Sequence, residues 1–123
     1  MTILVAYGSL HVGARIIHRL VRFPQVEFVG QAREADEALV LISSRKPRLV
    51  ILDLQLSRGT GLDVLRTIIR LQFRSLVMMT SGSSFPQDRR ECIKEGADYF
   101  FHLPDEIDDL EGIVHQLAKV ESA

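Results

Sequence analysis

The sequence has almost no cysteine, no long apolar run and almost no net charge. Its single cysteine, Cys92, excludes an internal disulfide and a cysteine-based metal cluster, and a lone thiol in this helix-like context is usually a small buried side chain. No apolar run approaches the roughly 20 residues that span a bilayer, and the N-terminus lacks the pattern of a signal peptide. The net charge of -1 gives no electrostatic reason to expect nucleic-acid binding. We therefore expect a cytoplasmic protein without direct membrane or nucleic-acid contact.

The composition is that of a globular chain. Hydrophobic residues make up 46% of the 123 residues, which is enough to bury a substantial core. We find no internal repeat and no low-complexity linker. We therefore expect one domain over residues 1–123.

Short apolar runs alternate with helical patterns along the whole chain. The expected strands are Thr2–Ala6, Val26–Ala32, Leu49–Asp53, Ser75–Thr80 and Tyr99–Leu103. The expected helices are Leu10–Arg22, Ala35–Ser44, Leu62–Leu71, Pro86–Glu95 and Ile107–Val120. Five βα units predict an α/β fold of three layers, with a five-stranded parallel sheet between two layers of helices. The flavodoxin-like order 2-1-3-4-5 suits five units and places the more polar second strand at an edge.

Asp53 is the first candidate for a functional residue. It directly follows Leu49–Leu52, a run without charge that indicates a strand buried on both faces. In open α/β sheets, the functional crevice lies at the carboxyl ends of the strands. Thr80 ends the next expected strand and should reach the same edge.

Two segments carry a resemblance to a known family. DLQLSRGTGLDVL begins at Asp53, and GADYFF leads into the fifth expected strand. Together with Thr80, they resemble the CheY-like receiver domain of two-component response regulators, over essentially the whole chain. The resemblance implies a non-enzymatic signalling domain in a phosphorelay.

The resemblance also implies roles for individual residues. Asp53 would accept a phosphoryl group from a histidine kinase, and Thr80 would bind a phosphoryl oxygen. Gln55, in the loop after Asp53, is a further candidate for the phosphate pocket. Phe100 holds the place of the aromatic residue that moves with phosphorylation.

Three positions depart from the family pattern. Tyr7 and Gly8 stand where the family has two acidic residues that hold Mg²⁺, and no acidic residue occurs before Glu27. Leu103 stands where the family has a lysine that pairs with the phosphoryl group. Phosphoryl transfer depends on positioning and on neutralising charge on the phosphoryl oxygens, and losing one such stabiliser typically costs about 10²–10³ in rate. We therefore expect no cofactor, with weak or absent Mg²⁺ binding.

Other basic residues offer only limited compensation. Arg58, five residues after Asp53, or His102 could partly substitute for the missing charges. His102, however, alternates with Leu103 along the strand, so their side chains should point to opposite sides. The face of the first helix that carries Arg15, Arg19 and Arg22 is expected to be solvated, with contact to an acidic partner as the alternative.

Three functional hypotheses remain open. The first is an atypical receiver that signals through protein contacts, with a histidine kinase, an output domain or a second copy as partner. Receivers commonly pair through the fourth helix, fifth strand and fifth helix, which here would span roughly Asp88 to Val120. The second is a conventional receiver phosphorylated on Asp53. The third, an enzyme that binds a flavin or a nucleotide, rests on fold analogy alone.

Overall fold

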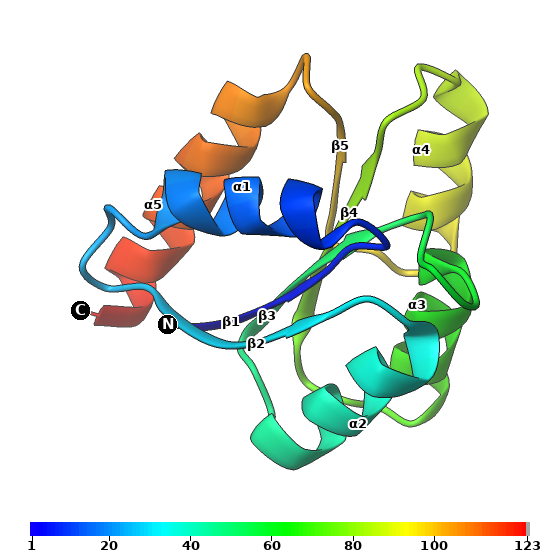
Figure 1. The fold of residues 1–123 in the computed structure, drawn as a ribbon, viewed down its shortest axis with the longest axis horizontal. Helices are drawn as coiled ribbons and strands as arrows, with labels where there is room; N and C mark the ends of the chain where they lie inside the picture. The colour runs from blue at the N-terminus through cyan, green and yellow to red at the C-terminus, as the bar shows by residue number, and fades with distance from the viewer. Residues whose placement is uncertain (123) are drawn as a thin grey trace.

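The computed structural model describes residues 1–122, and strands and helices alternate through them (Figure 1). The strands are β1 (Thr2–Ala6), β2 (Glu27–Ala32), β3 (Leu49–Asp53), β4 (Leu76–Ser81) and β5 (Tyr99–His102). The helices are α1 (Leu10–Leu20), α2 (Ala35–Arg45), α3 (Gly61–Arg70), α4 (Pro86–Lys94) and α5 (Ile107–Ser122). No helix in this part of the chain is both long and apolar enough to cross a membrane.

The five strands form one parallel sheet in the order β2-β1-β3-β4-β5. Helices α1 and α5 cover one face, and α2, α3 and α4 cover the other (Figure 1). This arrangement confirms the predicted three-layer α/β fold and its strand order. It follows from the right-handed crossovers that join parallel strands through helices.

The central strand β3 is buried on both faces of the sheet. Leu49 and Ile51 contribute to the core beneath α1 and α5, whereas Val50 and Leu52 contribute to the core beneath the other three helices. A strand buried on both faces needs apolar residues at every position, which explains the continuous run. Cys92 is buried in the second of these cores, as expected, and burial raises the pKa of its thiol to about 11.

Several element boundaries differ from the predicted ones. Helix α1 ends at Leu20, two residues before the predicted end, because the chain turns before Pro24. Helix α3 begins at Gly61, one residue early, because the Thr60 hydroxyl caps it by accepting a hydrogen bond from the Asp63 N–H. Strand β5 ends at His102, one residue before the predicted end at Leu103.

Candidate functional site

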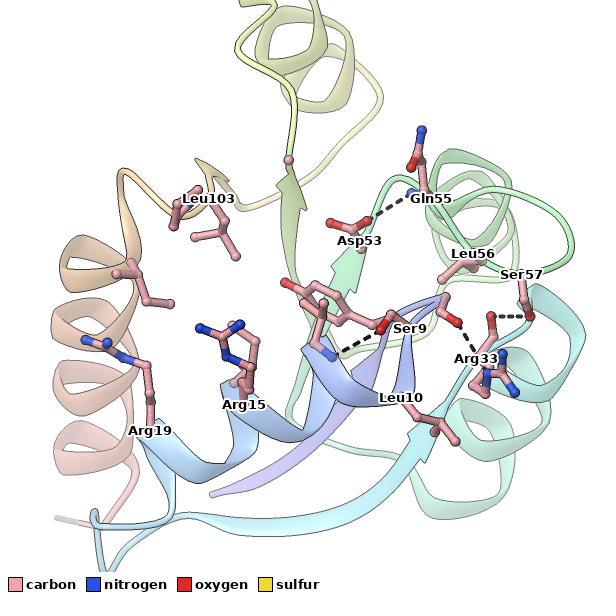
Figure 2. Close-up of a pocket in the computed structure, with 17 residues that line it drawn as sticks. Ser9, Leu10, Arg15, Arg19, Arg33, Asp53, Gln55, Leu56, Ser57 and Leu103 are labelled. Carbon is pink, nitrogen blue, oxygen red and sulfur yellow. Dashed lines mark hydrogen bonds between the residues drawn. The ribbon is translucent and has the colours of Figure 1, made fainter.

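The sheet brings Asp53 and Thr80 together at its carboxyl edge. The two residues are direct partners in the parallel register of β3 and β4. Tyr7 follows the last residue of the neighbouring strand β1 and reaches the same edge. This edge forms the floor of a cleft of about 990 Å³. In Figure 2, α1 and the β5–α5 connection border the cleft on one side and the β3–α3 loop on the other.

Asp53 is held in place by a close contact between β3 and the start of α3. The Gly61 N–H donates to the Leu54 carbonyl at 2.9 Å. A Cβ atom on Gly61 would lie 2.1 Å from the Asp53 carbonyl oxygen, so only glycine permits this approach. The glycine therefore fixes the end of β3, from which the Asp53 side chain enters the cleft.

A chain of hydrogen bonds links Tyr7, Thr80 and Asp53. The Thr80 hydroxyl lies 2.9 Å from the Asp53 Oδ1 atom and 2.5 Å from the Tyr7 hydroxyl. An ionised carboxylate can only accept, so Thr80 donates its single proton to Asp53 and accepts the proton of Tyr7. The Gln55 N–H donates to the other carboxylate oxygen of Asp53 at 3.2 Å. The hydroxyl of Thr80 is thus engaged both as donor and as acceptor.

Burial is the largest influence on the pKa values of Tyr7 and Asp53. Thr80 has no exposed surface and Tyr7 is 3% exposed. Burial, with a smaller contribution from the charge of Asp53, holds the pKa of the Tyr7 phenol far above its ordinary value, so Tyr7 remains a neutral donor. Burial also raises the pKa of the Asp53 carboxyl, while the hydrogen bonds from Thr80 and Gln55 oppose that shift.

The β1–α1 connection packs directly against the β3–α3 loop. The Gly8 N–H donates to the Gln55 carbonyl at 3.3 Å. A Cβ atom on Gly8 would lie 3.1 to 3.2 Å from backbone atoms of Gln55, Leu56 and Ser57, so the two loops touch. On the other side, Arg33 donates from Nε to the Gly8 carbonyl at 3.2 Å.

The remaining predicted site residues lie at different places around this edge. Leu103 lines the cleft. Phe100 is buried in the core on the α4 side of the sheet, where the Arg89 guanidinium lies 5.3 Å from its ring centre. A role for Phe100 as a switch stays a prediction.

Neither expected compensating cation lines the cleft. His102 Nδ1 lies 2.6 Å from the Ser83 carbonyl oxygen, and its ring packs edge-to-face with Phe100, away from Leu103 as predicted. Arg58 is largely exposed and forms an ion pair with Glu34 at 3.7 Å.

The three arginines on the basic face of α1 are exposed, as expected, and two of them also have the acidic partner that was the alternative. Arg19 forms ion pairs with Glu111 at 2.7 Å and with Asp108 at 3.1 Å, and Arg22 approaches Glu111 at 3.4 Å. The acidic partner of this face is therefore α5 of the same chain. Sequence reasoning also missed that Arg15, Arg19 and Arg33 line the cleft beside Asp53. The spacing of Arg15 and Arg19, four residues apart on one helix face, was the available signal.

Comparison with known proteins gives a consistent result. Residues 11–115 match the sequence profile described as "Response regulator receiver domain". The nitrate/nitrite response regulator protein NarL of Escherichia coli is 29% identical over 98 residues, which cover 80% of this chain and 45% of that protein. The protein-glutamate methylesterase/protein-glutamine glutaminase of Bacillus subtilis is 30% identical over 103 residues, which cover 83% of this chain and 29% of that enzyme. The chain therefore spans less than half the length of these relatives.

A solved structure confirms the fold. The signal receiver domain of the putative response regulator NarL from Mycobacterium tuberculosis superposes with a TM-score of 0.86 at 20% identity, over 96% of this chain and 95% of that one. At this level of identity, the similarity concerns the fold alone.

Proposed function

Because this chain belongs to the response regulator receiver domain family, we propose that it is an atypical receiver of two-component signalling that acts mainly through protein contacts, with slow or absent phosphorylation of Asp53. The observation that carries the proposal is the hydrogen-bonded chain of Tyr7, Thr80 and Asp53. To bind a phosphoryl oxygen, the Thr80 hydroxyl must first give up its bond to Asp53. The buried phenol of Tyr7 also occupies the space beside the Thr80 hydroxyl.

The residues at this edge do not fit the Mg²⁺ site that the family implies. Mg²⁺ takes six oxygen ligands and is usually held by one or two carboxylates together with phosphate oxygens and waters. Asp53 is the single carboxylate among the residues that line the cleft, as far as residues 1–122 are concerned. The Gln55 carbonyl already accepts the Gly8 N–H. Within the same residues, no group of three or more acidic, histidine or cysteine side chains is suited to a metal.

Arginines line the cleft, but among residues 1–122 no basic side chain lies within 4.0 Å of the Asp53 carboxylate, where a phosphoryl group would need a cation. Such a group carries about -1.5 to -2 charges at neutral pH. Leu103 offers only an apolar side chain to the cleft, and Arg19 is already paired with α5. Removing one electrostatic stabiliser typically costs about 10²–10³ in rate, so the absence of two supports slow transfer.

A conventional phosphoacceptor is the second candidate function. The direct pairing of Asp53 with Thr80, at 2.9 Å between their side-chain oxygens, favours it. This arrangement places a hydroxyl where a phosphoryl oxygen on Asp53 would need a donor. The two candidates differ in whether Asp53 becomes phosphorylated at a useful rate.

We propose the face of α4, β5 and α5 as the contact surface for a kinase, an output domain or a second copy in the cytoplasm. Ile93 on α4 and Val120 on α5 expose 46% and 74% of their surface there, beside Tyr99 on β5. Burial of such apolar side chains is the usual source of interface stability.

The test is exposure of the chain to phosphoramidate with millimolar Mg²⁺, followed by intact-mass measurement. We expect at most a trace of the species heavier by one phosphoryl group, under conditions that fully modify a conventional receiver assayed alongside. Asp53→Asn is the matched control for modification at any other residue. Rapid modification that Asp53→Asn abolishes would establish the conventional receiver and overturn the proposal.

A further inference from the structure

The cleft above Tyr7 has the size and wall chemistry of a small-molecule site. Its volume of about 990 Å³ lies at the upper end of the range of ligand pockets, roughly 300 to 1,000 Å³. Three arginines and one carboxylate line it, among the residues that the structure describes. The cleft is therefore basic although the whole chain carries a net charge of -1.

The arginines differ in how far their charge is already compensated. Arg19 pairs with Glu111 and Asp108. Arg15 lies one helical turn before Arg19 on the same side of α1, and no carboxylate of residues 1–122 comes within 4.0 Å of its guanidinium. Figure 2 shows both side chains extending from α1 toward the side where Leu103 lies. Two like charges four residues apart repel each other, so an anion between them would be favoured.

Two further features support an anionic ligand. The first turn of α1 contains no acidic residue, so the Ser9 hydroxyl, which accepts from the Val12 N–H, caps the positive end of this helix without a compensating negative charge. The carboxylate of Asp53, the one negative group of the floor, is bound by the hydroxyl of Thr80 and the N–H of Gln55.

Much of the rest of the wall is apolar, although Ser9, Gln55 and Ser57 also line it. Val12 on α1, Leu103 after β5 and Ile107 at the start of α5 line the cleft together with Tyr7 at its floor. Leu103 and Ile107 pack against the core beneath α1 and α5 and are thus fixed in position. A charged lining residue beside fixed apolar walls is the usual composition of a site for an organic molecule.

We propose that this cleft binds a small organic anion, with its charged group at Arg15 and its apolar body against Val12, Leu103 and Ile107. The inference goes beyond the proposed function and is independent of phosphorylation at Asp53. The size of the cleft, within the range of ligand pockets, favours a small molecule over an extended acidic segment of a partner protein. Occupation of the cleft would supply an input signal at the edge where the family receives a phosphoryl group.

The test uses three probes on the unphosphorylated chain without metal. Anilinonaphthalene sulfonate carries an apolar body and one negative charge, N-phenyl-1-naphthylamine has the same body without the sulfonate, and inorganic phosphate has the charge without the body. Binding is followed by amide chemical shifts, which locate each probe. We expect the sulfonate to shift amides of Val12, Arg15 and Leu103 at lower concentration than either other probe.

Two variants make the test specific. Arg15→Gln should weaken binding of the sulfonate by roughly threefold to tenfold, the usual effect of one partly exposed charge-assisted contact. Arg90→Gln, at an exposed arginine on α4 that lines neither this cleft nor the α4–β5–α5 face, should leave it unchanged.

Five results would overturn the proposal. These are equal binding of the uncharged probe, equal binding of phosphate, shifts located outside the cleft, equal effects of the two variants, and the absence of any shift at millimolar probe. Because no phosphodonor is present, none of these results bears on phosphorylation of Asp53, so the two proposals fail separately.

Discussion

Tyr7→Phe removes the first donor of the hydrogen-bonded chain and little else. The lost hydroxyl lies 2.5 Å from Thr80 Oγ1 in a region that is almost closed to solvent. The vacated space is that of one oxygen atom, too small for a water molecule to replace the bond. A buried hydrogen bond contributes about 0.5–1.5 kcal/mol net, so we expect about 1 kcal/mol less stability and a melting temperature about 4 °C lower.

The same variant should also change the ionisation of Asp53. A hydroxyl that accepts a hydrogen bond becomes a better donor, so Tyr7 strengthens the bond from Thr80 to Asp53. Without it, the carboxylate of Asp53 is less stabilised and its pKa, already raised by burial, rises further. The measurement is a carboxyl-carbon NMR titration of Asp53 together with thermal unfolding.

Tyr99→Phe is the matched control. Tyr99 is the other tyrosine of the chain, is half-buried on β5, and forms no hydrogen bond through its hydroxyl with any residue of 1–122. We expect little change in the melting temperature or in the pKa of Asp53. Equal melting temperatures for the two variants, or a lower Asp53 pKa in Tyr7→Phe, would refute the reasoning.

Three further predictions concern stability. The pKa of Asp53 in the folded state lies above its unfolded value of about 3.9, so the stability of the protein falls as the pH rises through this interval. Asp53→Asn should therefore raise the melting temperature at neutral pH but not in acid. A lower melting temperature of this variant at neutral pH would contradict the reasoning. Gly8→Ala should lower the free energy of unfolding by about 1–2 kcal/mol because its Cβ meets backbone atoms of the β3–α3 loop. Gly112→Ala on α5, whose Cβ meets nothing within 4 Å, should raise it by about 0.5–1 kcal/mol. Chemical denaturation measures both, and a stabilising effect of Gly8→Ala would show that the β1–α1 connection and the β3–α3 loop do not touch. Glu111→Gln should cost about 1 kcal/mol because a nearly buried carboxylate loses both arginine partners. Arg22→Gln should have little effect, and a larger loss than in Glu111→Gln would contradict the assignment of Glu111 as the centre of the cluster.

The fold could be predicted because its signals are local. Continuous apolar runs and helical spacings each lie within a dozen residues, and few topologies join five βα units. The pairing of Asp53 with Thr80 followed from this, since both lie at the carboxyl ends of neighbouring parallel strands. Helix ends depended on capping detail, as Thr60 shows at the start of α3.

The bonds of the site could not be predicted in the same way. The sequence shows that Tyr7 stands where an acid is usual, but not that its phenol reaches Thr80, 73 residues away. The contact of Arg19 with Glu111 spans 92 residues and depends on how α1 and α5 pack. The sequence indicated that the site lacks the acidic pair and the lysine of the family. The hydrogen bonds among Tyr7, Thr80 and Asp53 could be seen only in the three-dimensional structure.

The most direct test of the central claim is an amide NMR titration with Mg²⁺, followed by beryllium fluoride as a mimic of the phosphoryl group. The Tyr7–Thr80–Asp53 chain and the single carboxylate predict no clustered shifts at millimolar concentrations of either. Shifts centred on Asp53 and Thr80 and extending to Phe100 would show a pocket that binds and switches, and would contradict the claim.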